Sequence, residues 1–290
     1  MTDPKPFKIA IASGKGGTGK TLVSTNLFYT LQQLDYNVTL VDCDAEEPNA
    51  LVFINGDHQN TFNVTQKVPV IDESKCTFCG KCHEYCNYNA IFILPPAKII
   101  KVIKDLCHGC GACSVACNFG AISEKDESLG TVSQYTVSAK AGVIEARMKV
   151  GVFSPVSVIK TAIREAVKVS GKTGIIIMDS PPGTSCPFIQ TVAAADYVIL
   201  VAEPTPFGVS DLIQSVETLK TIQKPFGVIV NRAGLGDDEI YKYLQKENIS
   251  LLMEIPFSKK IASLYSKGGL VSKLTPEWQN ELTRMFHSLC

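Results

Sequence analysis

Residues 14–21 read Gly-Lys-Gly-Gly-Thr-Gly-Lys-Thr, and no other segment of the 290-residue chain constrains the fold as strongly. The apolar run from Phe7 to Ala12 precedes this segment, and apolar residues at helical spacing follow it from Leu22 to Leu34. The pattern predicts a strand, a glycine-rich loop and a helix, and it fits the G-x-x-x-x-G-K-[ST] motif of a phosphate-binding loop. A chance glycine-rich turn is the alternative.

Each residue type in such a loop has a chemical task. Glycines let consecutive backbone N–H groups curl around an anion, and the following helix adds the positive end of its dipole. Lys20 brings a positive charge to the β- and γ-phosphates of a nucleotide, and the hydroxyl of Thr21 is a ligand for Mg²⁺. The predicted nucleotide-binding residues of the loop are Gly14, Lys15, Gly16, Gly17, Thr18, Gly19, Lys20 and Thr21.

A second lysine, Lys15, stands near the start of the loop. In this form the loop resembles the deviant Walker A motif of the MinD/ParA-like ATPases, a family that includes the nitrogenase iron protein and the Mrp-type iron–sulfur carriers. The resemblance implies that Lys15 reaches across a dimer interface to the partner's nucleotide; a solvated loop lysine is the alternative. It also implies ATP and Mg²⁺ as cofactors, catalytic roles for Lys15 and Lys20, and an ATP-dependent homodimer or related heterodimer.

Acidic residues follow the strand predicted at 37–41. At the carboxyl end of a parallel strand, Asp42 and Asp44 are expected to face the nucleotide crevice. By resemblance to switch I of the family, Asp44 orients the attacking water and Asp42 is an outer-sphere contact of Mg²⁺. The alternative is an acidic start of a loop.

Later strand ends carry the remaining predicted nucleotide-site residues. A continuous apolar run ends at Asp179, which resembles the Mg²⁺-side carboxylate of a Walker B strand, and Gly183 resembles the γ-phosphate-sensing pivot of switch II. By resemblance Asn231 reads the adenine edge, where an amide both donates and accepts hydrogen bonds. A strand-end turn residue is the alternative for Asn231. Pro256 is expected beside the base.

Eight of the eleven cysteines form two runs of identical spacing, C-x₂-C-x₂-C-x₃-C, at an offset of 31 residues. This duplication is typical of a bacterial two-cluster ferredoxin, in which the fourth cysteine of each run binds the other cluster. His83 and His108 lie inside the runs and are interpreted as neighbours, not ligands. Two Cys₄ zinc sites are the alternative. The predicted ligands are Cys76, Cys79, Cys82 and Cys117 for one [4Fe–4S] cluster, and Cys107, Cys110, Cys113 and Cys86 for the other.

The cysteine runs interrupt the α/β pattern. We therefore predict an α/β fold of the MinD/ParA P-loop type, with a mostly parallel sheet and an inserted ferredoxin-like α+β module. The expected boundaries are 1–56 and 151–290 for the two parts of the ATPase domain and 57–150 for the inserted ferredoxin domain. The insertion falls between switch I and switch II.

Composition indicates which classes of binding partner are not expected. Lys+Arg and Asp+Glu both number 28, so that no general attraction to nucleic acid or to anionic membrane is expected. No apolar run approaches the roughly 20 residues of a spanning helix, and residues 1–8 lack a signal peptide's apolar region. A cytoplasmic protein is expected, in which cysteines favour metal ligation over disulfides. Apolar residues near one helical face of 276–290 favour core packing over membrane binding, because a lysine-rich polar face is missing.

These patterns predict an ATP-binding and hydrolysing iron–sulfur protein. In this hypothesis, nucleotide-driven dimerisation is coupled to electron transfer to, or metal-cluster assembly on, a redox or metallocluster partner protein. The competing hypothesis is a ParA/MinD-like positioning or scaffold ATPase with a redox-sensing or docking ferredoxin module. Cys186 follows switch II directly and is either a metal or cluster ligand between two subunits or a small packed residue.

Overall fold

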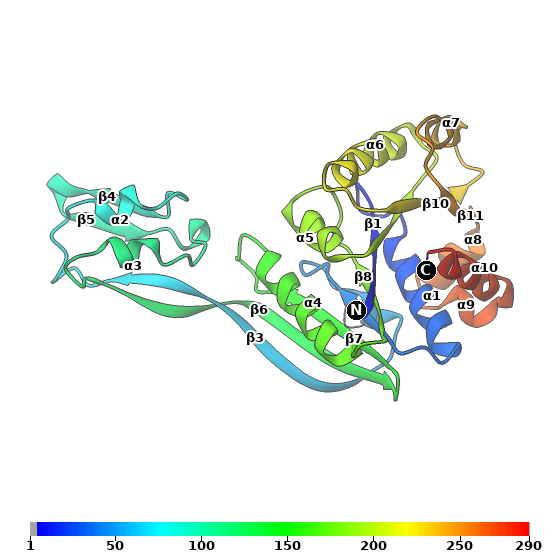
Figure 1. Ribbon diagram of the computed structural model, residues 1–290, viewed down its shortest axis with the longest axis horizontal. Helices are drawn as coiled ribbons and strands as arrows, with labels where there is room; N and C mark the ends of the chain where they lie inside the picture. The colour runs from blue at the N-terminus through cyan, green and yellow to red at the C-terminus, as the bar shows by residue number, and fades with distance from the viewer. Residues whose placement is uncertain (1–4, 290) are drawn as a thin grey trace. The chain divides into compact units, whose positions relative to one another are not determined.

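The computed structural model describes residues 5–289 and divides the chain into two units (Figure 1). The first unit comprises residues up to 62, 132–147 and from 156 onward; the second comprises 63–131 and 148–155. Residues 57–62 and 132–147, which the sequence analysis assigned to the insertion, thus lie in the first unit.

A nine-stranded sheet is the framework of the first unit, with strand order β11-β10-β9-β1-β8-β2-β7-β6-β3. Every pairing from β11 across to β7 is parallel. Two of the strands, β3 and β6, continue into the second unit. The strands are β1 (Phe7–Ala12), β2 (Val38–Asp42), β3 (Asp57–Ile71), β6 (Ile122–Ser138), β7 (Ala141–Met148), β8 (Ile175–Asp179), β9 (Tyr197–Ala202), β10 (Phe226–Ala233) and β11 (Leu251–Pro256).

Helices cover both faces of this sheet. In Figure 1, α4 and α5 lie on one side of β1 and β8, and α1 lies on the other with α9 and α10. The helices are α1 (Lys20–Gln33), α4 (Val156–Ser170), α5 (Cys186–Ala194), α6 (Pro206–Thr221), α7 (Glu239–Lys246), α8 (Lys259–Tyr265), α9 (Val271–Leu274) and α10 (Pro276–His287), with a short 3₁₀ turn, η1, at Ala50–Val52.

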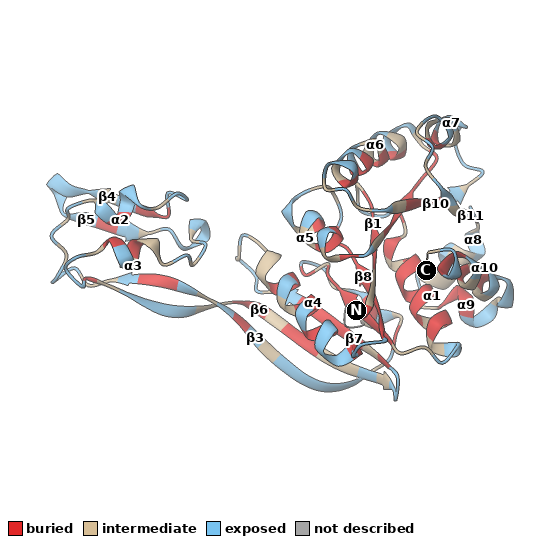
Figure 2. Cartoon of the chain, viewed as in Figure 1, coloured by how far each residue is buried: buried red, intermediate tan, exposed pale blue. Residues whose placement is uncertain are grey.

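The central strands read as unbroken apolar runs because both of their faces are covered. All five residues of β2 and all five of β8 are buried, and red strands dominate the first unit in Figure 2. The apolar face of α10, including Trp278 and Phe286, joins the core that α1 forms with the sheet. Core packing of the C-terminal helix, as the sequence analysis favoured, is therefore confirmed.

The second unit is small, and cysteines form part of its core. It contains α2 (Lys81–Glu84), α3 (Ala112–Ala116), the 3₁₀ turns η2 (Pro95–Ala97) and η3 (Lys104–Leu106), and the antiparallel strands β4 (Ile91–Leu94) and β5 (Ile99–Val102). Its core consists of Cys82, Ile91, Ile100 and Cys113, with a few partly buried side chains around them. A unit with so little apolar interior needs additional stabilisation.

The duplication of the cysteine runs recurs in the backbone. Asp72 donates its N–H to Ala121 O at 2.7 Å, and Ile103, 31 residues further on, donates to Ala90 O at 2.8 Å. Each of these bonds joins the segment before one cysteine run to the segment after the other. Left-handed φ values recur in matched pairs: Phe78 (56°) with Gly109 (64°), Gly80 (84°) with Gly111 (75°), and Asn89 (52°) with Gly120 (59°).

Within residues 5–289, no helix combines the length and the apolar character that crossing a membrane requires.

Candidate functional site

The glycine-rich loop joins β1 to α1 at the carboxyl end of the parallel strands. A cleft with a volume of about 400 Å³ opens on this loop. This volume is typical of a small-molecule binding site. The loop contributes Gly16, Gly17, Gly19, Lys20 and Thr21 to its walls. Predicted residues that line the cleft from elsewhere in the chain are Asp44, Asn231 and Pro256.

Position 19 requires glycine for two reasons: its backbone conformation is left-handed, and the Asn231 side chain leaves no space for a Cβ atom. The φ of Gly19 is 103°, and a Cβ atom there would lie 2.4 Å from Nδ2 of Asn231. That Nδ2 donates to Thr18 O at 2.7 Å, and Oδ1 accepts the N–H of Arg232 at 2.8 Å. Asn231 therefore fixes the loop and keeps one amide hydrogen and one lone pair for a ligand.

Lys20 is a buried cation on the floor of this site. It is only 7% exposed, and its Nζ donates to Lys15 O at 3.4 Å. Burial lowers the pKa of Lys20, while the charges of Asp179 and Asp44 act against that effect. An anion bound at the loop would compensate the buried charge.

Asp42 and Asp179 stand side by side at the ends of β2 and β8 and are each 1% exposed. Burial, with the charge of Asp179, raises the pKa of Asp42 to about 8. Burial raises the pKa of Asp179 to about 6, against the lowering effect of the Thr21 hydroxyl and of Lys20. Two adjacent buried carboxylates are an environment that a divalent cation would stabilise.

The two aspartates differ in their hydrogen bonds. One oxygen of Asp42 accepts the N–H of Asp44, and the other accepts those of Asn49 and Ala50, both at 2.8 Å. Asp42 thus holds the loop after β2 in place. In the part of the chain that the structure describes, neither buried oxygen of Asp179 has a donor in good hydrogen-bonding geometry. Asp179 is therefore the carboxylate that is free to receive a cation.

Asp44 reaches the cleft itself, together with Glu47 and Asn49 of the same loop. Burial raises the pKa of Asp44, while the charge of Lys20 lowers it. A carboxylate with a raised pKa is a stronger base, and it stands here on the wall of the cleft that carries the phosphate loop.

Gly183 lies in the loop after β8, where its neighbour Pro182 lines the cleft. Its φ is 88°, and its N–H donates to Ser13 O at 3.2 Å, which ties this loop to the phosphate loop. Cys186 is exposed at the first residue of α5.

Arg232 is a residue of the cleft that the sequence analysis did not single out. The pairing of β10 with β11 shifts register between Asn231 and Ala233, and Arg232 between them has a left-handed φ of 58°. Such a bulge redirects a side chain. The Arg232 guanidinium donates to Gly17 O at 3.4 Å and pairs with Glu203 at 3.0 Å. A sequence signal existed, because Arg232 directly follows the predicted Asn231 after a buried apolar run.

Another part of the cleft wall is largely apolar. Beside the predicted Pro256, this wall is formed by residues that directly precede α8 and by residues along α8. An apolar wall suits a flat aromatic base. These residues are Phe257, Ser258, Ile261, Ala262 and Tyr265. Phe257 directly follows the predicted Pro256, whereas sequence reasoning missed the other four because helix periodicity does not show which short helix borders a cleft.

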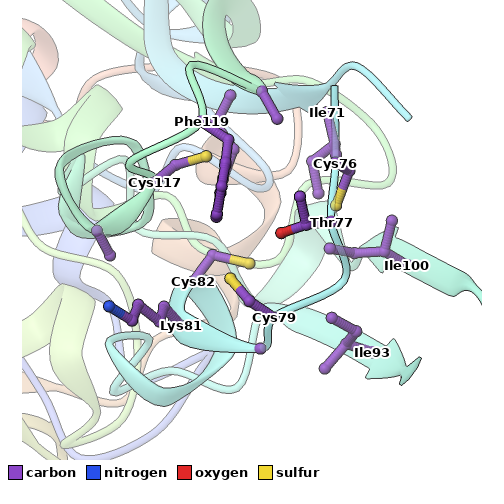
Figure 3. Close-up of a pocket in the computed structure, with 14 residues that line it drawn as sticks. Ile71, Cys76, Thr77, Cys79, Lys81, Cys82, Ile93, Ile100, Cys117 and Phe119 are labelled. Carbon is purple, nitrogen blue, oxygen red and sulfur yellow. The ribbon is translucent and has the colours of Figure 1, made fainter. Parts of the chain in front are cut away.

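In the second unit, Cys76, Cys79, Cys82 and Cys117 line one small cavity (Figure 3). The first three come from one run and Cys117 from the other. Figure 3 shows their sulfur atoms turned toward the same space, with Ile71, Ile93, Ile100 and Phe119 around them. The structure thus brings together the four cysteines that the spacing assigned to one cluster.

The other predicted set, Cys86, Cys107, Cys110 and Cys113, lines a second cavity. Its lining residues include Glu124 and His108. His108 stacks on Tyr88 with ring centroids 3.9 Å apart, and His83 donates Nδ1–H to Ile91 O at 2.6 Å. Both histidines thus have structural contacts of their own.

Three cysteine sulfurs accept backbone N–H groups, a contact that stabilises thiolates and cluster sulfurs. Phe78 donates to Cys76 at 3.4 Å, Gly109 to Cys107 at 3.4 Å and Ala90 to Cys86 at 3.3 Å. Within residues 5–289, no three Cys, His, Asp or Glu side chains form a group that could hold a single metal ion. The thiols surround two cavities, and a cubane, which takes one thiolate at each of four irons, suits four thiols arranged in this way.

Comparison with known proteins places the chain in a family. The CobQ/CobB/MinD/ParA nucleotide binding domain matches residues 9–271. An uncharacterized protein of Methanocaldococcus jannaschii is 31% identical over 276 residues, 90% of this chain and 89% of that protein. An iron-sulfur cluster carrier protein of Pyrococcus horikoshii is 21% identical over 271 residues, 88% of this chain and 75% of that protein. The solved structure of the Pyrococcus horikoshii septum site-determining protein MinD complexed with Mg-ADP has a TM-score of 0.57 at 19% identity, covering 98% of this chain and 96% of that one.

The parallel sheet, the phosphate loop after its first strand and the carboxylates at the strand ends define a P-loop nucleotide-binding protein. The chain belongs to the CobQ/CobB/MinD/ParA family of nucleotide-binding domains. The family and fold expected from the loop are thereby confirmed, and the ferredoxin-like nature of the second unit stays a prediction.

Proposed function

We propose that this protein is an ATP-hydrolysing iron–sulfur protein in which nucleotide state controls electron delivery to, or cluster assembly on, a partner protein. One observation carries this proposal. The eight cysteines converge into two four-thiol cavities in a chain whose other unit has a phosphate loop and cleft. The similarity to an iron-sulfur cluster carrier protein of Pyrococcus horikoshii supports the same function.

In the cleft, the triphosphate would lie on the loop, with the base against the apolar wall of α8. The buried ammonium of Lys20 would compensate the β- and γ-phosphates. Thr21 and Asp179 would hold Mg²⁺, which supplies charge neutralisation at the phosphates when bound. Asp179 fits this role because both of its buried oxygens lack a donor in good geometry among the described residues.

Hydrolysis needs a positioned water molecule. Asp44 lies on the cleft wall within the electrostatic influence of Lys20, so that its carboxylate would accept a hydrogen bond from a water beside the γ-phosphate. Lys15 would complete the site of the partner subunit in an ATP-dependent homodimer or related heterodimer. Gly183 would report the γ-phosphate, since no side chain restrains its backbone and its N–H already contacts the phosphate loop.

The two cavities would hold [4Fe–4S] clusters, one on Cys76, Cys79, Cys82 and Cys117 and one on Cys107, Cys110, Cys113 and Cys86. A route for coupling exists along the chain. The loop that Asp42 anchors leads through η1 into β3, and β3 continues into the second unit. Movement of that loop on nucleotide binding would be transmitted through β3 to the cluster module.

The test is electron paramagnetic resonance of anaerobically purified, dithionite-reduced protein with and without MgATP. We expect cluster signals whose shape or midpoint potential changes on adding MgATP. Lys20→Ala, a matched control outside the cluster module, should retain the signals and lose the response. Cluster signals that are identical with and without MgATP in the native protein would contradict nucleotide control.

The alternative is a positioning or scaffold ATPase, which the structural likeness to a septum site-determining protein favours. In that case the cluster module would sense redox state or dock a partner. Electron transfer that stops in Asp44→Ala supports the first function. Unchanged electron transfer together with ATP-dependent assembly on a surface or polymer supports the second.

A further inference from the structure

Glu203 follows β9 directly and is a buried acid for which the hydrolysis described above has no use. It is 5% exposed. Its Oε1 lies 3.0 Å from a guanidinium nitrogen of Arg232, and its Oε2 lies 3.8 Å from Nζ of Lys15. A single buried carboxylate therefore faces two cations, Lys15 from the phosphate loop and Arg232 from the bulge near the end of β10.

The two ion pairs differ in strength. Arg232 is fixed by its bulge and by its contact with Gly17 O, and its pair with Glu203 has hydrogen-bonding distance. The Lys15 pair is longer, at 3.8 Å, and lies beyond hydrogen-bonding distance, while the side chains of both cations are partly exposed, Lys15 at 32% and Arg232 at 48%. Arg232 is thus the firm partner of the carboxylate, and Lys15 is the exchangeable one.

Within Lys15, the backbone is held by hydrogen bonds, whereas the side chain can rotate. Its carbonyl oxygen accepts the Ser13 hydroxyl at 2.6 Å and the Lys20 ammonium at 3.4 Å, so that the backbone of Lys15 is held from two sides. Rotation of the long side chain is then the simplest way for the ammonium to leave Glu203.

We propose that Glu203 is a positioning residue that holds the Lys15 ammonium in the isolated subunit and releases it when two nucleotide-bound subunits associate. The inference rests on the proposed function, in which Lys15 reaches the partner's nucleotide. One ammonium cannot form a full pair with Glu203 and with a phosphate of the partner at the same time. Because Arg232 stays in place, release of Lys15 does not leave a buried charge unpaired. Glu203 therefore sets the nucleotide concentration at which subunits associate.

Glu203→Gln tests the hold on Lys15 in the nucleotide-free protein. The amide keeps the shape of the side chain and an acceptor for Arg232, but it removes the charge that attracts Lys15. We expect acetylation of the Lys15 amine by an N-hydroxysuccinimide ester, quantified by mass spectrometry, to be about two- to fivefold faster, the factor that a partly exposed ion pair is worth. Asp196→Asn, which removes the similar pair with Lys8 at 3.2 Å, should leave Lys15 labelling unchanged.

The same variants are then compared for self-association in Mg²⁺ and a non-hydrolysable ATP analogue by sedimentation equilibrium. Glu203→Gln should associate about two- to fivefold more tightly than the native protein. If Glu203→Gln does not fold, Glu203→Asp, which draws the carboxylate away from Lys15, should shift both measurements in the same direction.

Unchanged labelling of Lys15, or weaker association of the variant, overturns the inference, because Glu203 would then not hold Lys15 or would orient it in the dimer. Faster labelling without nucleotide-dependent association of the native protein has a different meaning. It supports the hold on Lys15, overturns its role in association and contradicts the dimer of the proposed function.

Discussion

At the scale of single residues, the site depends on charges that are buried before any ligand arrives. Lys20, Asp42 and Asp179 are each at most 7% exposed. Burying an ion is costly unless an opposite charge or hydrogen bonds compensate it. Asp42 has three backbone donors, and the Thr21 hydroxyl and Lys20 favour the ionised form of Asp179, but burial still raises the pKa of both carboxyl groups and lowers the pKa of Lys20. The chain therefore compensates these buried charges only in part, and a nucleotide with a cation would complete the compensation.

Gly19→Ala should weaken nucleotide binding by about tenfold or more in a protein that still folds. The added Cβ would meet Asn231 Nδ2 at 2.4 Å in a backbone with φ of 103°, and strain of this kind costs on the order of 1–3 kcal/mol. Binding of a fluorescent ATP analogue measures the effect. Gly17→Ala is the matched control, because φ there is also positive, at 78°, but the space is open, so that a smaller loss is expected. Equal losses in both variants would contradict a role for the Asn231 contact.

The stability of the metal-free protein should fall as pH rises from about 4 to about 8. The pKa values of Asp42 and Asp179, about 8 and about 6, lie above the usual aspartate value, so the folded state binds more protons than the unfolded state in this window. The free energy of unfolding therefore decreases with pH, by roughly 1.4 kcal/mol per unit of pKa shift as an upper bound. Calorimetric melts at pH 5.5 and pH 8 measure it.

The stabilisation of the protein by Mg²⁺ should increase as pH rises, because the cation favours the ionised carboxylates that high pH produces. The rise in melting temperature on adding Mg²⁺ with nucleotide should be larger at pH 8 than at pH 5.5, and Asp179→Asn should remove most of the difference. A Mg²⁺ effect that is independent of pH would argue against this carboxylate pair as the cation site.

At the scale of elements, irregular backbone places the chemistry. The bulge in β10 turns Arg232 toward the phosphate loop, and the left-handed Gly80 and Gly111 begin the short helices α2 and α3 that carry cysteines. The hydrogen bonds Asp72–Ala121 and Ile103–Ala90 join each cysteine run to the end of the other. The fourth thiol of each cavity is therefore supplied by the opposite run.

Paired cysteine variants test this exchange between the two halves. Cys76→Ala with Cys117→Ala removes two ligands of one predicted cluster, so that one cluster should survive. Cys76→Ala with Cys86→Ala removes one ligand from each cluster, and both should be lost or damaged, although both mutations lie in the same run. Iron content per chain and electron paramagnetic resonance measure the outcome. If the second pair retained one intact cluster and the first retained none, the fourth ligand would come from within each run.

At the scale of the whole molecule, the features that could be predicted from the sequence are those set by the spacing of nearby residues. The strand–loop–helix around Lys20, the parallel sheet and the family follow from motif and apolar periodicity, and the structure and comparisons confirm them. The four-cysteine groupings that spacing assigned are also those that line the two cavities. Three features were not predicted from the sequence. The long strand β3 is mostly polar and exposed, so it lacks an apolar pattern; the bulge at Arg232 depends on pairing with β11; and the Lys15–Glu203 pair joins residues far apart in sequence.

The two units should differ in their dependence on iron. The first unit has a large apolar core around the sheet, whereas the core of the second centres on four buried residues, two of which are predicted cluster ligands. Removing iron with a chelator under reducing conditions should therefore unfold residues 63–131 and leave the nucleotide cleft intact. Hydrogen–deuterium exchange should show fast exchange in β4 and β5, with little change in β1 and β8. ATP-analogue binding should change less than about twofold, because no cysteine lines the cleft among the residues that the structure describes. Protection of β4 and β5 that survives complete iron removal would show that the small apolar core alone holds this unit, and the clusters would then have a redox role without a structural one.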